Sequence, residues 1–316
     1  MDPIDVAILT ENRYEDPPVV GWYERNILDE ERLLGEALGR LGLTSRRLDW
    51  ARADVDWTQV GAAVFRTTWD YFLRPAAFAA WLDRAARATR LINCEELVRW
   101  NLDKRYLADL AARGVRIVPF RVVERGDPRP LADHLAVEGW EEAVLKPVVS
   151  GAGRETHRIE PGRAAEVEPT FRRLVAAEAM LLQPFQCAVL EDGERSLVVI
   201  GGAVTHAVRK VARPGEFRVH DDHGGTVHPH EPTAGEIAFA EAAVAACDPA
   251  PLYARVDLVR ADDGEPALME LELIEPELFF RFYQPAADAL ATEIARELST
   301  PTAAERSSAP RAPTIT

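Results

Sequence analysis

The sequence predicts an α/β (α+β) protein that starts with a small open α/β domain and continues into segments richer in antiparallel sheet. The first observation is the alternation of short apolar runs with amphipathic segments over residues 6–93, which is typical of β-α units. The second is a series of short β-like runs after residue 180, separated by turn residues. We therefore expect two differently built regions in one chain.

The N-terminal elements follow from apolar periodicity. Residues 26–41 place side chains such as Ile27, Leu34 and Leu38 on one face, which predicts a helix. In order, we expect a strand at 6–10, this helix, a strand at 60–65, a polar and aromatic loop at 66–71, and a helix at 75–90 with proline in its first turn.

The remaining elements are predicted in the same way. We expect helices at 97–113, 130–138 and 285–298, β-rich segments at 115–123 and 143–146, antiparallel runs at 180–185, 196–201, 203–210 and 216–220, and strands at 252–259 and 267–273 around an Asp-Asp-Gly turn at 262–264. Residues 299–316 are rich in proline, alanine, serine and threonine and have no periodic apolar face, so a disordered tail is expected.

Length and composition restrict the class of protein. A chain of 316 residues with 47% hydrophobic content can form two or three domains. The formal charge of −15, from 52 acidic and 37 basic residues, argues against nucleic-acid binding, which needs clustered positive charge. The three cysteines lack CxxC spacing, and no signal peptide or membrane span is visible. We expect a cytoplasmic protein that binds neither nucleic acid nor membrane.

Two lysines and a glycine loop indicate phosphate binding. Lys104 lies near the start of a predicted helix, and Lys146 ends a predicted strand just before a loop that contains Gly151 and Gly153. A lysine contacts phosphate as a point charge, and glycines let backbone N–H groups approach phosphate oxygens. Each signal has a simple alternative, a solvated lysine or an ordinary turn.

A third element is the run Leu-Leu-Gln-Pro-Phe at residues 181–185. A strand that ends at a proline leaves backbone groups unpaired, so the segment from Gln183 to Phe185 is a candidate for contact with an adenine edge. Glu191 follows and is a candidate acceptor for ribose hydroxyls. The alternative is a strand that merely ends at its proline.

The fourth element is a pair of charged strands near the C-terminus. Arg255 and Asp257 alternate on one predicted strand, and Glu270 and Glu272 alternate on the next, so the four groups can converge across a hairpin. Three carboxylates in one site repel one another unless cations lie among them, and Mg²⁺ with nucleotide phosphates is the natural partner. A solvated outer sheet face is the alternative.

These elements occur in the order found in the ATP-grasp superfamily, which the sequence resembles over residues 1–298. The segment ELELIEP, which contains Glu270, is similar to the EINxxSP-type ending of prokaryotic glutathione synthetase, with Glu272 where that family has asparagine. This departure keeps an oxygen ligand and adds a negative charge. The stretches WNLDKRYL, GGAVTHAVRK and ARVDL look like the branch of the superfamily that contains D-cycloserine ligase.

The resemblance implies a carboxylate-amine ligase with an ATP-grasp fold. ATP would lie between a central lobe at residues 96–182 and a C-terminal lobe at 183–298, after an N-terminal α/β domain at 1–95. Its γ-phosphoryl group would pass to a small amino-acid-like carboxylate, and an amine would then displace phosphate to form an amide within one molecule or between two. Such a reaction would belong to specialised metabolism such as antibiotic biosynthesis.

The same resemblance implies a role for each candidate residue. Phosphate contacts fall to Lys104, Lys146, Gly151 and Gly153, adenine contacts to Gln183 and Phe185, ribose contacts to Glu191, and Mg²⁺ contacts to Asp257, Glu270 and Glu272, with two ions expected and Mn²⁺ as an alternative. Arg255 would stabilise the acyl phosphate and the later oxyanion, and Lys210, Arg213, Arg218 and Arg66 are candidates for contacts to the substrate carboxylate or the transferring phosphoryl group. The expected partners are small carboxylate and amine substrates, and a homodimer is the default assembly.

Two other kinds of function stay open. His220, His223, His228 and His230 are close in sequence and could bind Zn²⁺, which would make the protein a zinc-dependent hydrolase or a metal-binding module. A small-molecule kinase or a nucleotide-binding regulator would share the nucleotide residues, because a fold does not fix a function. Bound zinc would favour the first reading, and a phosphorylated product without an amide would indicate a kinase.

Overall fold

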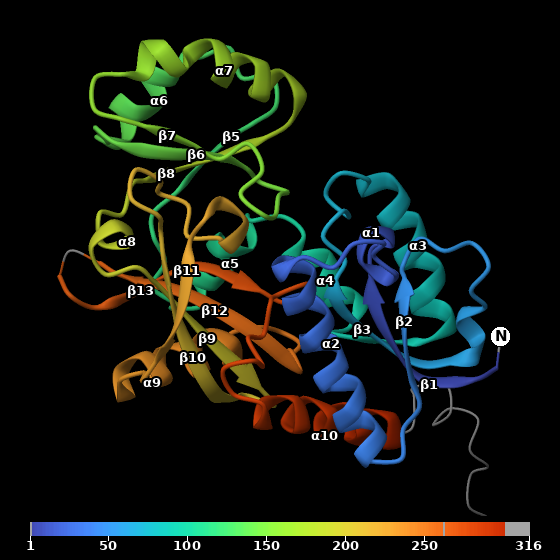
Figure 1. Cartoon of the computed structure of the whole chain (residues 1–316). Coiled ribbons are helices and arrows are strands. Elements are labelled where there is room, and N and C mark those ends of the chain that lie inside the picture. Colours follow the sequence, from blue (N-terminus) through green and yellow to red (C-terminus); the bar gives the residue numbers. More distant parts are fainter. Residues whose placement is uncertain (1, 262, 301–316) are drawn as a thin grey trace, which may run out of the picture.

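The computed structural model describes residues 2–261 and 263–300, which form three β-sheets with helices packed around them (Figure 1). The predicted mixed α/β architecture is confirmed. Asp262 of the predicted turn and residues 301–316 of the predicted tail lie outside the described residues. Within the described ranges, every helix is too short or too polar to cross a membrane.

The N-terminal sheet is parallel, with the strand order β2-β1-β3-β4. Its elements are β1 (Ile4–Thr10), α1 (Asn12–Glu15), α2 (Trp22–Arg40), β2 (Ser45–Asp49), the 3₁₀ turn η1 (Trp57–Gln59), β3 (Val60–Thr67), α3 (Pro75–Ala88) and β4 (Arg90–Ile92). Alternate residues of β1 enter two cores: Val6 packs with α2 and Ala7 packs with α3. Helices cover both faces, which explains the continuous apolar run of β1.

The central sheet is antiparallel, with the strand order β5-β8-β6-β7. Its elements are β5 (Arg121–Val123), α6 (Leu131–Glu138), β6 (Ala143–Pro147), β7 (His157–Ile159), α7 (Ala164–Ala177) and β8 (Met180–Pro184). Helices α6 and α7 cover one face, where Leu145 and Leu182 are buried. Because side chains alternate along a strand, Lys146 and Gln183 belong to the opposite face.

The C-terminal sheet is also antiparallel, with the order β11-β10-β9-β12-β13. Its elements are α8 (Ala188–Glu191), β9 (Glu194–Ile200), β10 (Ala203–Val211), the 3₁₀ turn η2 (Asp221–His223), β11 (Thr226–His230), α9 (Ala234–Ala245), β12 (Tyr253–Arg260), β13 (Pro266–Glu272) and α10 (Pro285–Ser299). Helices α4 (Glu95–Asn101) and α5 (Tyr106–Ala112) share a core with this sheet.

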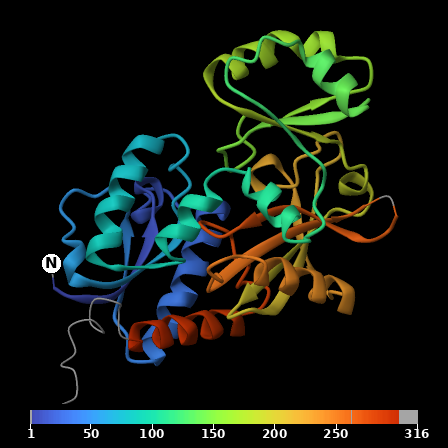
Figure 2. The ribbon, with the colours of Figure 1, turned by 180° about the vertical axis from the view of Figure 1, so that it is seen from behind.

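The last helix returns to the first domain. In both views α10 lies beside α2 (Figures 1 and 2), and residues such as Leu34 of α2 and Leu290 of α10 share one core. The predicted domain limits divide the chain at points that differ from the boundaries between the sheets. The limit at 182 falls inside β8, and α10 packs on the N-terminal domain although it follows the C-terminal sheet in the chain.

Several element predictions were wrong in detail. The helix expected at 97–113 is divided into α4 and α5, because Lys104 N–H donates to Val148 O at 2.9 Å and the Asn101 side chain bonds the backbone of β13. Of residues 115–123, only β5 is a strand. Residues 216–220 form no strand, because the Glu216 carboxylate accepts hydrogen bonds from the N–H groups of the two following residues.

Candidate active site

Two adjoining cavities lie where the three sheets meet, and each encloses about 870 Å³ of space that is open to solvent. The first cavity lies between the central and C-terminal sheets. The second lies between the N-terminal domain and the C-terminal sheet. Both are lined by Lys104, Ser150, Gly151, Ala152, His220, Glu270 and Glu272, so the two cavities share a wall.

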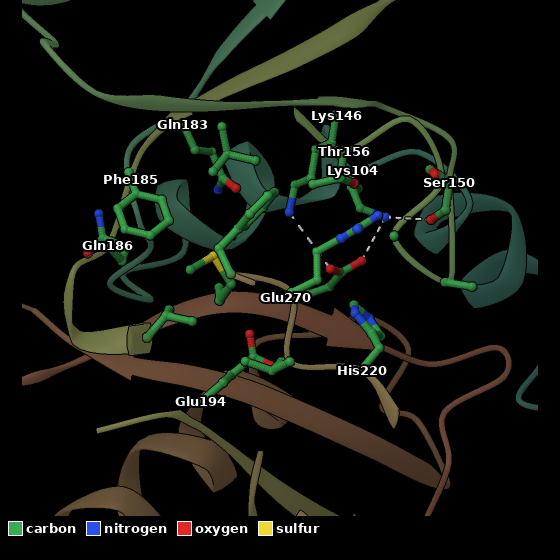
Figure 3. A pocket seen from close by; sticks show the side chains of 18 of the residues that line it. Lys104, Lys146, Ser150, Thr156, Gln183, Phe185, Gln186, Glu194, His220 and Glu270 are labelled. Atoms are coloured by element: carbon green, nitrogen blue, oxygen red, sulfur yellow. Dashed lines mark hydrogen bonds and ion pairs between the residues drawn. The ribbon is translucent and has the colours of Figure 1, made fainter. Parts of the chain in front are cut away.

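Glu270 of β13 holds two lysines at the centre of the first cavity (Figure 3). The Lys104 Nζ lies 2.7 Å from Glu270 Oε1 and donates to Ser150 O, while the Lys146 Nζ lies 3.8 Å from Glu270 Oε2. Burial opposes ionisation of Glu270, but the two lysines hold its pKa at about 2. Burial, together with the charge of Lys104, lowers the pKa of Lys146. The cavity therefore presents closely spaced cations around one ionised carboxylate.

The four ionisable groups of β12 and β13 lie on one face, as strand alternation suggests. Asp257 is directly opposite Glu270, and Arg255 is opposite Glu272. Arg255 Nε donates to Asp257 Oδ1 at 2.9 Å, and its guanidinium is also paired with Glu272. Burial and the negative charges of Asp257 and Glu270 raise the pKa of Glu272 to about 7, although Arg255 acts in the opposite direction.

Asp257 lies behind the cavity wall. It is 3% exposed and does not line either cavity, whereas Glu270 and Glu272 line both. Its carboxylate accepts from Ser196 Oγ at 2.5 Å and pairs with the Lys210 Nζ at 3.2 Å. Burial favours the neutral acid, but Arg255 and Lys210 hold the pKa of Asp257 well below its ordinary value. Asp257 thus positions the two cations that lie in front of it.

Lysine occurs only three times in the whole chain, at Lys104, Lys146 and Lys210. Lys104 and Lys146 line the first cavity, Lys104 and Lys210 line the second, and Lys210 also pairs with Glu194 at 2.5 Å. All other side chains with a permanent positive charge are arginines. Lysine, whose charge is compact, is thus found only at the cavities, whereas arginine occurs both at the cavities and over the rest of the molecule.

The far end of the first cavity is apolar and aromatic. Phe185 and Gln186 follow β8 (Figure 3), and Phe217 lies with its ring 6.3 Å from that of Phe185. The guanidinium of Arg158 lies 3.9 Å above the Phe185 ring. The Gln183 amide nitrogen is buried and has no hydrogen-bond partner among the described residues, so it is available to a ligand in the cavity.

The glycine loop after β6 passes beside both cavities. Gly153 has a φ of +66°, and a Cβ there would lie 3.1 Å from His223 Nε2. A Cβ at Gly151 would lie 2.8 Å from a Phe72 ring carbon. Gly153 therefore requires glycine, and a side chain at Gly151 would require the Phe72 ring to move, so the loop can bring its backbone close to a ligand.

Some predicted residues are not brought to the cavities. Glu191 ends α8, is exposed and does not line the first cavity, whereas Glu194 does. Arg66 is 1% exposed, is paired with Glu30, and donates to Pro276 O, so it links the N-terminal domain to the segment after β13. Arg218 lines the first cavity and pairs with Glu216, while Arg213 lines neither cavity.

Sequence reasoning missed Glu194 and the role of His220. Glu194 starts β9, where it resembled an ordinary polar residue at a strand end. His220 lines both cavities, and burial together with the charges of Lys210 and Arg255 lowers its pKa to about 3. It is therefore neutral near pH 7, and its Nδ1 has no hydrogen-bond partner in the described part of the chain.

The predicted zinc cluster is wrong for the residues that the structure describes, which contain no group of three or more histidine, cysteine or acidic side chains arranged around one metal position. His228 contacts Thr226, and His230 pairs with Glu236 at 3.2 Å. The three predicted Mg²⁺ carboxylates are not arranged around one point either, because lysines and Arg255 lie among them. Glu270 and Glu272 nevertheless provide the hard oxygen atoms that Mg²⁺ prefers.

The second cavity combines charged and aromatic walls. Its cationic side carries Lys104, Lys210 and Arg255. Its N-terminal side is aromatic, with Tyr23, Trp69 and Tyr71, and the segment after β13 adds the carboxylates Glu275 and Glu277. Such a cavity suits a small molecule that has both an anionic and a cationic or apolar end.

The chain is similar in sequence and in structure to several known proteins. Residues 6–93 match the family described as D-cycloserine synthetase DcsG, N-terminal domain. The chain is 36% identical over 281 residues to the cycloserine biosynthesis protein DcsG of Streptomyces lavendulae, covering 83% of this chain and 92% of the relative. The crystal structure of D-cycloserine synthetase DcsG matches with a TM-score of 0.80 and 34% identity, over 93% of this chain and 99% of the other. A RimK domain ATP-grasp protein from Sphaerobacter thermophilus matches with a TM-score of 0.65 and 21% identity, over 92% and 98%.

Proposed function

The chain belongs to the family of D-cycloserine synthetase DcsG, and from this premise we propose that it is an ATP-dependent ligase joining the carboxylate of a small amino-acid-like molecule to an amine. The ATP-grasp fold expected from the sequence is confirmed by the solved structures. The Streptomyces lavendulae relative is described as a cycloserine biosynthesis protein. We extend from it a role in antibiotic biosynthesis, with an amide bond formed within one molecule or between two.

The proposal that ATP binds in the first cavity rests on the different chemistry of its two ends. The aromatic end, with Phe185 and the unpartnered Gln183 amide, suits adenine. The opposite end, with Lys104 and Lys146, suits the phosphates. Glu194 lies between these ends in the role expected of Glu191, as the acceptor for ribose hydroxyls. The glycine loop supplies backbone N–H groups near the phosphates.

Glu270 and Glu272 would hold Mg²⁺, because both line the cavity and both offer carboxylate oxygens. Asp257 would join them directly only after releasing its contacts to Arg255 and Lys210. When bound, Mg²⁺ neutralises charge on the phosphoryl group during transfer. We expect two ions per site, with Mn²⁺ as a substitute.

The residues of the chain itself position the reacting groups. A substrate carboxylate oxygen attacks the γ-phosphorus, the bond to the ADP oxygen breaks, and an acyl phosphate forms. The amine nitrogen then attacks the acyl carbon, the bond from that carbon to the phosphate oxygen breaks, and the nitrogen loses a proton as phosphate leaves. Arg255 lines the second cavity and is held by Asp257 and Glu272, so it can stabilise the oxyanion of this second step. The reaction needs no side-chain nucleophile.

Release of ADP tests this function. The purified protein is incubated with ATP and Mg²⁺ across a panel of amino acids and related carboxylates, with and without added amines, and Glu270→Gln serves as the blank. Carboxylate-dependent ADP release with an amide product is expected. A stable phosphorylated product without an amide would instead indicate a kinase, and ATP binding without turnover across the panel would indicate a regulator.

A further inference from the structure

The glycine loop, residues 150–156 between β6 and β7, carries backbone strain beside the first cavity. Its Ser150 carbonyl accepts a hydrogen bond from Lys104 Nζ at 2.7 Å (Figure 3). Within the loop, Ala152 has a φ of +50° and Glu155 has a φ of +47°. Residues that carry a Cβ rarely adopt this left-handed conformation, and they keep it only where surrounding contacts hold them. The contacts around the loop therefore determine its conformation.

Arg154 connects the loop to the rest of the central lobe. Its Nη1 donates to Glu178 Oε1 at 2.9 Å and its Nη2 donates to Glu178 Oε2 at 2.7 Å, so the ion pair is bidentate. The Nη2 also donates to Val149 O at 3.0 Å. Glu178 lies between α7 and β8, and both side chains of the pair are partly buried. A bidentate arginine pair fixes orientation as well as distance, so it is suited to holding a strained loop.

The backbone of Arg154 also takes part in the hydrogen bonds inside the loop. Its N–H donates to Gly151 O at 3.1 Å, and its carbonyl accepts from Ser150 Oγ at 3.2 Å. Thr156 N donates to Gly153 O at 3.2 Å. These four neighbours of Arg154 line the first cavity, whereas Arg154 itself lines neither cavity. Arg154 therefore acts on a ligand through the loop rather than by contact.

On its other side, the loop rests on the N-terminal domain. Phe72 belongs to the connection between β3 and α3, and a Cβ at Gly151 would lie 2.8 Å from a carbon of its ring. The guanidinium carbon of Arg154 lies 5.9 Å from the centroid of the same ring. Guanidinium groups are attracted to aromatic faces. Glu178 and Phe72 thus hold Arg154 from two different parts of the chain.

A second ion pair at the loop is more exposed. Glu155 Oε2 lies 3.0 Å from Arg173 Nη2, and Arg173 is an exposed residue of α7. Exposed ion pairs contribute little to stability because water and salt screen them. The pair of Arg154 with Glu178 is therefore the stronger restraint on the loop.

We propose that Arg154, oriented by Glu178, is a positioning residue that holds the glycine loop in the conformation in which its N–H groups contact the transferring phosphoryl group. This inference rests on the proposed ligase function and adds to it the residue that sets the loop. A loop without this restraint adopts the reactive conformation less often. Loss of Arg154 therefore lowers the rate of phosphoryl transfer more than it lowers the affinity for ATP.

Two measurements on the full chain test the inference. Hydrogen exchange, followed by mass spectrometry on a peptide that covers residues 150–156, reports opening of the loop with and without Mg²⁺ and the non-hydrolysable analogue AMPPNP. Steady-state ADP release, with the best carboxylate of the panel described above, gives kcat and the KM for ATP. Both are carried out on the wild type, Arg154→Met, Glu178→Gln and the double variant. The matched control is Arg163→Met, which removes an exposed ion pair to Glu166 elsewhere on the central lobe.

We expect the loop amides to exchange about tenfold faster in Arg154→Met and in Glu178→Gln than in the wild type, because hydrogen bonds between charged groups are lost. In both variants kcat should fall on the order of a hundredfold, since small displacements of positioning groups have effects of this size, while the KM for ATP stays within about threefold. The double variant should resemble the single ones, because the two side chains act as one unit. Arg163→Met should match the wild type.

The outcomes separate this inference from the proposed function. If Arg154→Met exchanges and turns over like the wild type, or exchanges faster with an unchanged kcat, the inference is overturned and the ligase function stands. If the wild type releases no ADP with any carboxylate, the ligase function fails and exchange with AMPPNP decides the inference. Protection of the loop by AMPPNP that is lost in Arg154→Met then supports it, and equal exchange overturns it. If Arg154→Met does not fold, Glu178→Gln decides by the same criteria.

Discussion

The two cavities are built from different kinds of segment. Strands supply the central groups of the first cavity: Lys146 from β6, Gln183 from β8 and Glu270 from β13. Connecting segments supply much of the second, with Trp69 after β3 and Glu275 after β13. Backbone register fixes side chains on strands, whereas side chains on connections depend on contacts between domains. Groups on the strands are thus positioned by the sheets themselves, and groups on the connections are positioned by the packing of one domain on another.

The largest effect on activity is expected for a residue that lies on a strand of the first cavity. Glu270→Gln should lower kcat for ADP release on the order of a thousandfold, since it removes a charge that faces Lys104, Lys146 and the proposed Mg²⁺ site. Its thermal stability should also fall, because Lys104 and Lys146 lose the carboxylate that lies between them, while circular dichroism should show that the fold is kept. Glu265→Gln, at an exposed position just before β13, is the matched control and should behave like the wild type. Full turnover by Glu270→Gln would contradict the assignment.

A second substitution removes Arg66, which links the N-terminal domain to the segment after β13 beside the second cavity. Arg66→Met leaves Glu30 buried without its partner and removes the bond to Pro276 O, so the free energy of unfolding should fall by about 3 to 5 kcal/mol. Denaturant unfolding measures this loss. If Arg66→Met keeps its stability and loses only affinity for the carboxylate substrate, Arg66 is a substrate contact and not an interdomain link.

Comparing Glu194 with Glu191 tests which glutamate contacts the ribose of ATP in the first cavity. Glu194→Gln should raise the KM for ATP about tenfold, because hydrogen bonds to a charged group contribute about 1.5 to 3 kcal/mol. Glu191→Gln should leave that KM unchanged, since Glu191 is exposed on α8 and does not line the cavity. Steady-state kinetics at varied ATP concentration compares the two. The reverse pattern would return the ribose contact to Glu191.

The last prediction concerns the dependence of stability on pH and a carboxyl group of the second cavity. Burial, followed by the charge of Glu272, raises the pKa of Glu275 to about 8. The folded protein therefore holds a proton that the unfolded chain releases near pH 4.5, and the resulting stabilisation is lost as pH rises through about 8. Without ligands, the Tm of the wild type should fall more steeply between these pH values than that of Glu275→Gln. Parallel Tm curves would show that Glu275 is ionised throughout.

The strand-borne part of the site could be predicted well from the sequence, for a physical reason. Alternation along a strand determines which residues share a face, so the spacing of Arg255, Asp257, Glu270 and Glu272 is enough to group them. Alternation does not tell whether a side chain lines the cavity or is buried behind the residues that line it. Asp257 was expected to bind metal, and the structure instead buries it against Lys210 and Arg255.

The connection-borne part could not be read from the sequence. Arg66 and Glu30 are 36 positions apart, and only the packing of the N-terminal domain makes them a buried pair. Glu275 looked like part of a motif ending, because nothing local shows that Trp69 and Tyr71 lie beside it. The difference between Glu191 and Glu194 depends on one turn of helix, α8, which the sequence does not mark clearly.

The scarcity of lysine has a practical consequence. Reagents that acylate primary amines react with lysine side chains, and on this chain all three of these side chains face the cavities. Apart from the α-amino group of the chain, amine-directed labels, cross-linkers and coupling surfaces therefore react with side chains of the two cavities. Attachment through introduced cysteines or an affinity tag leaves the cavities intact. If bound nucleotide blocks acylation, comparing the three lysines shows which of them the nucleotide covers.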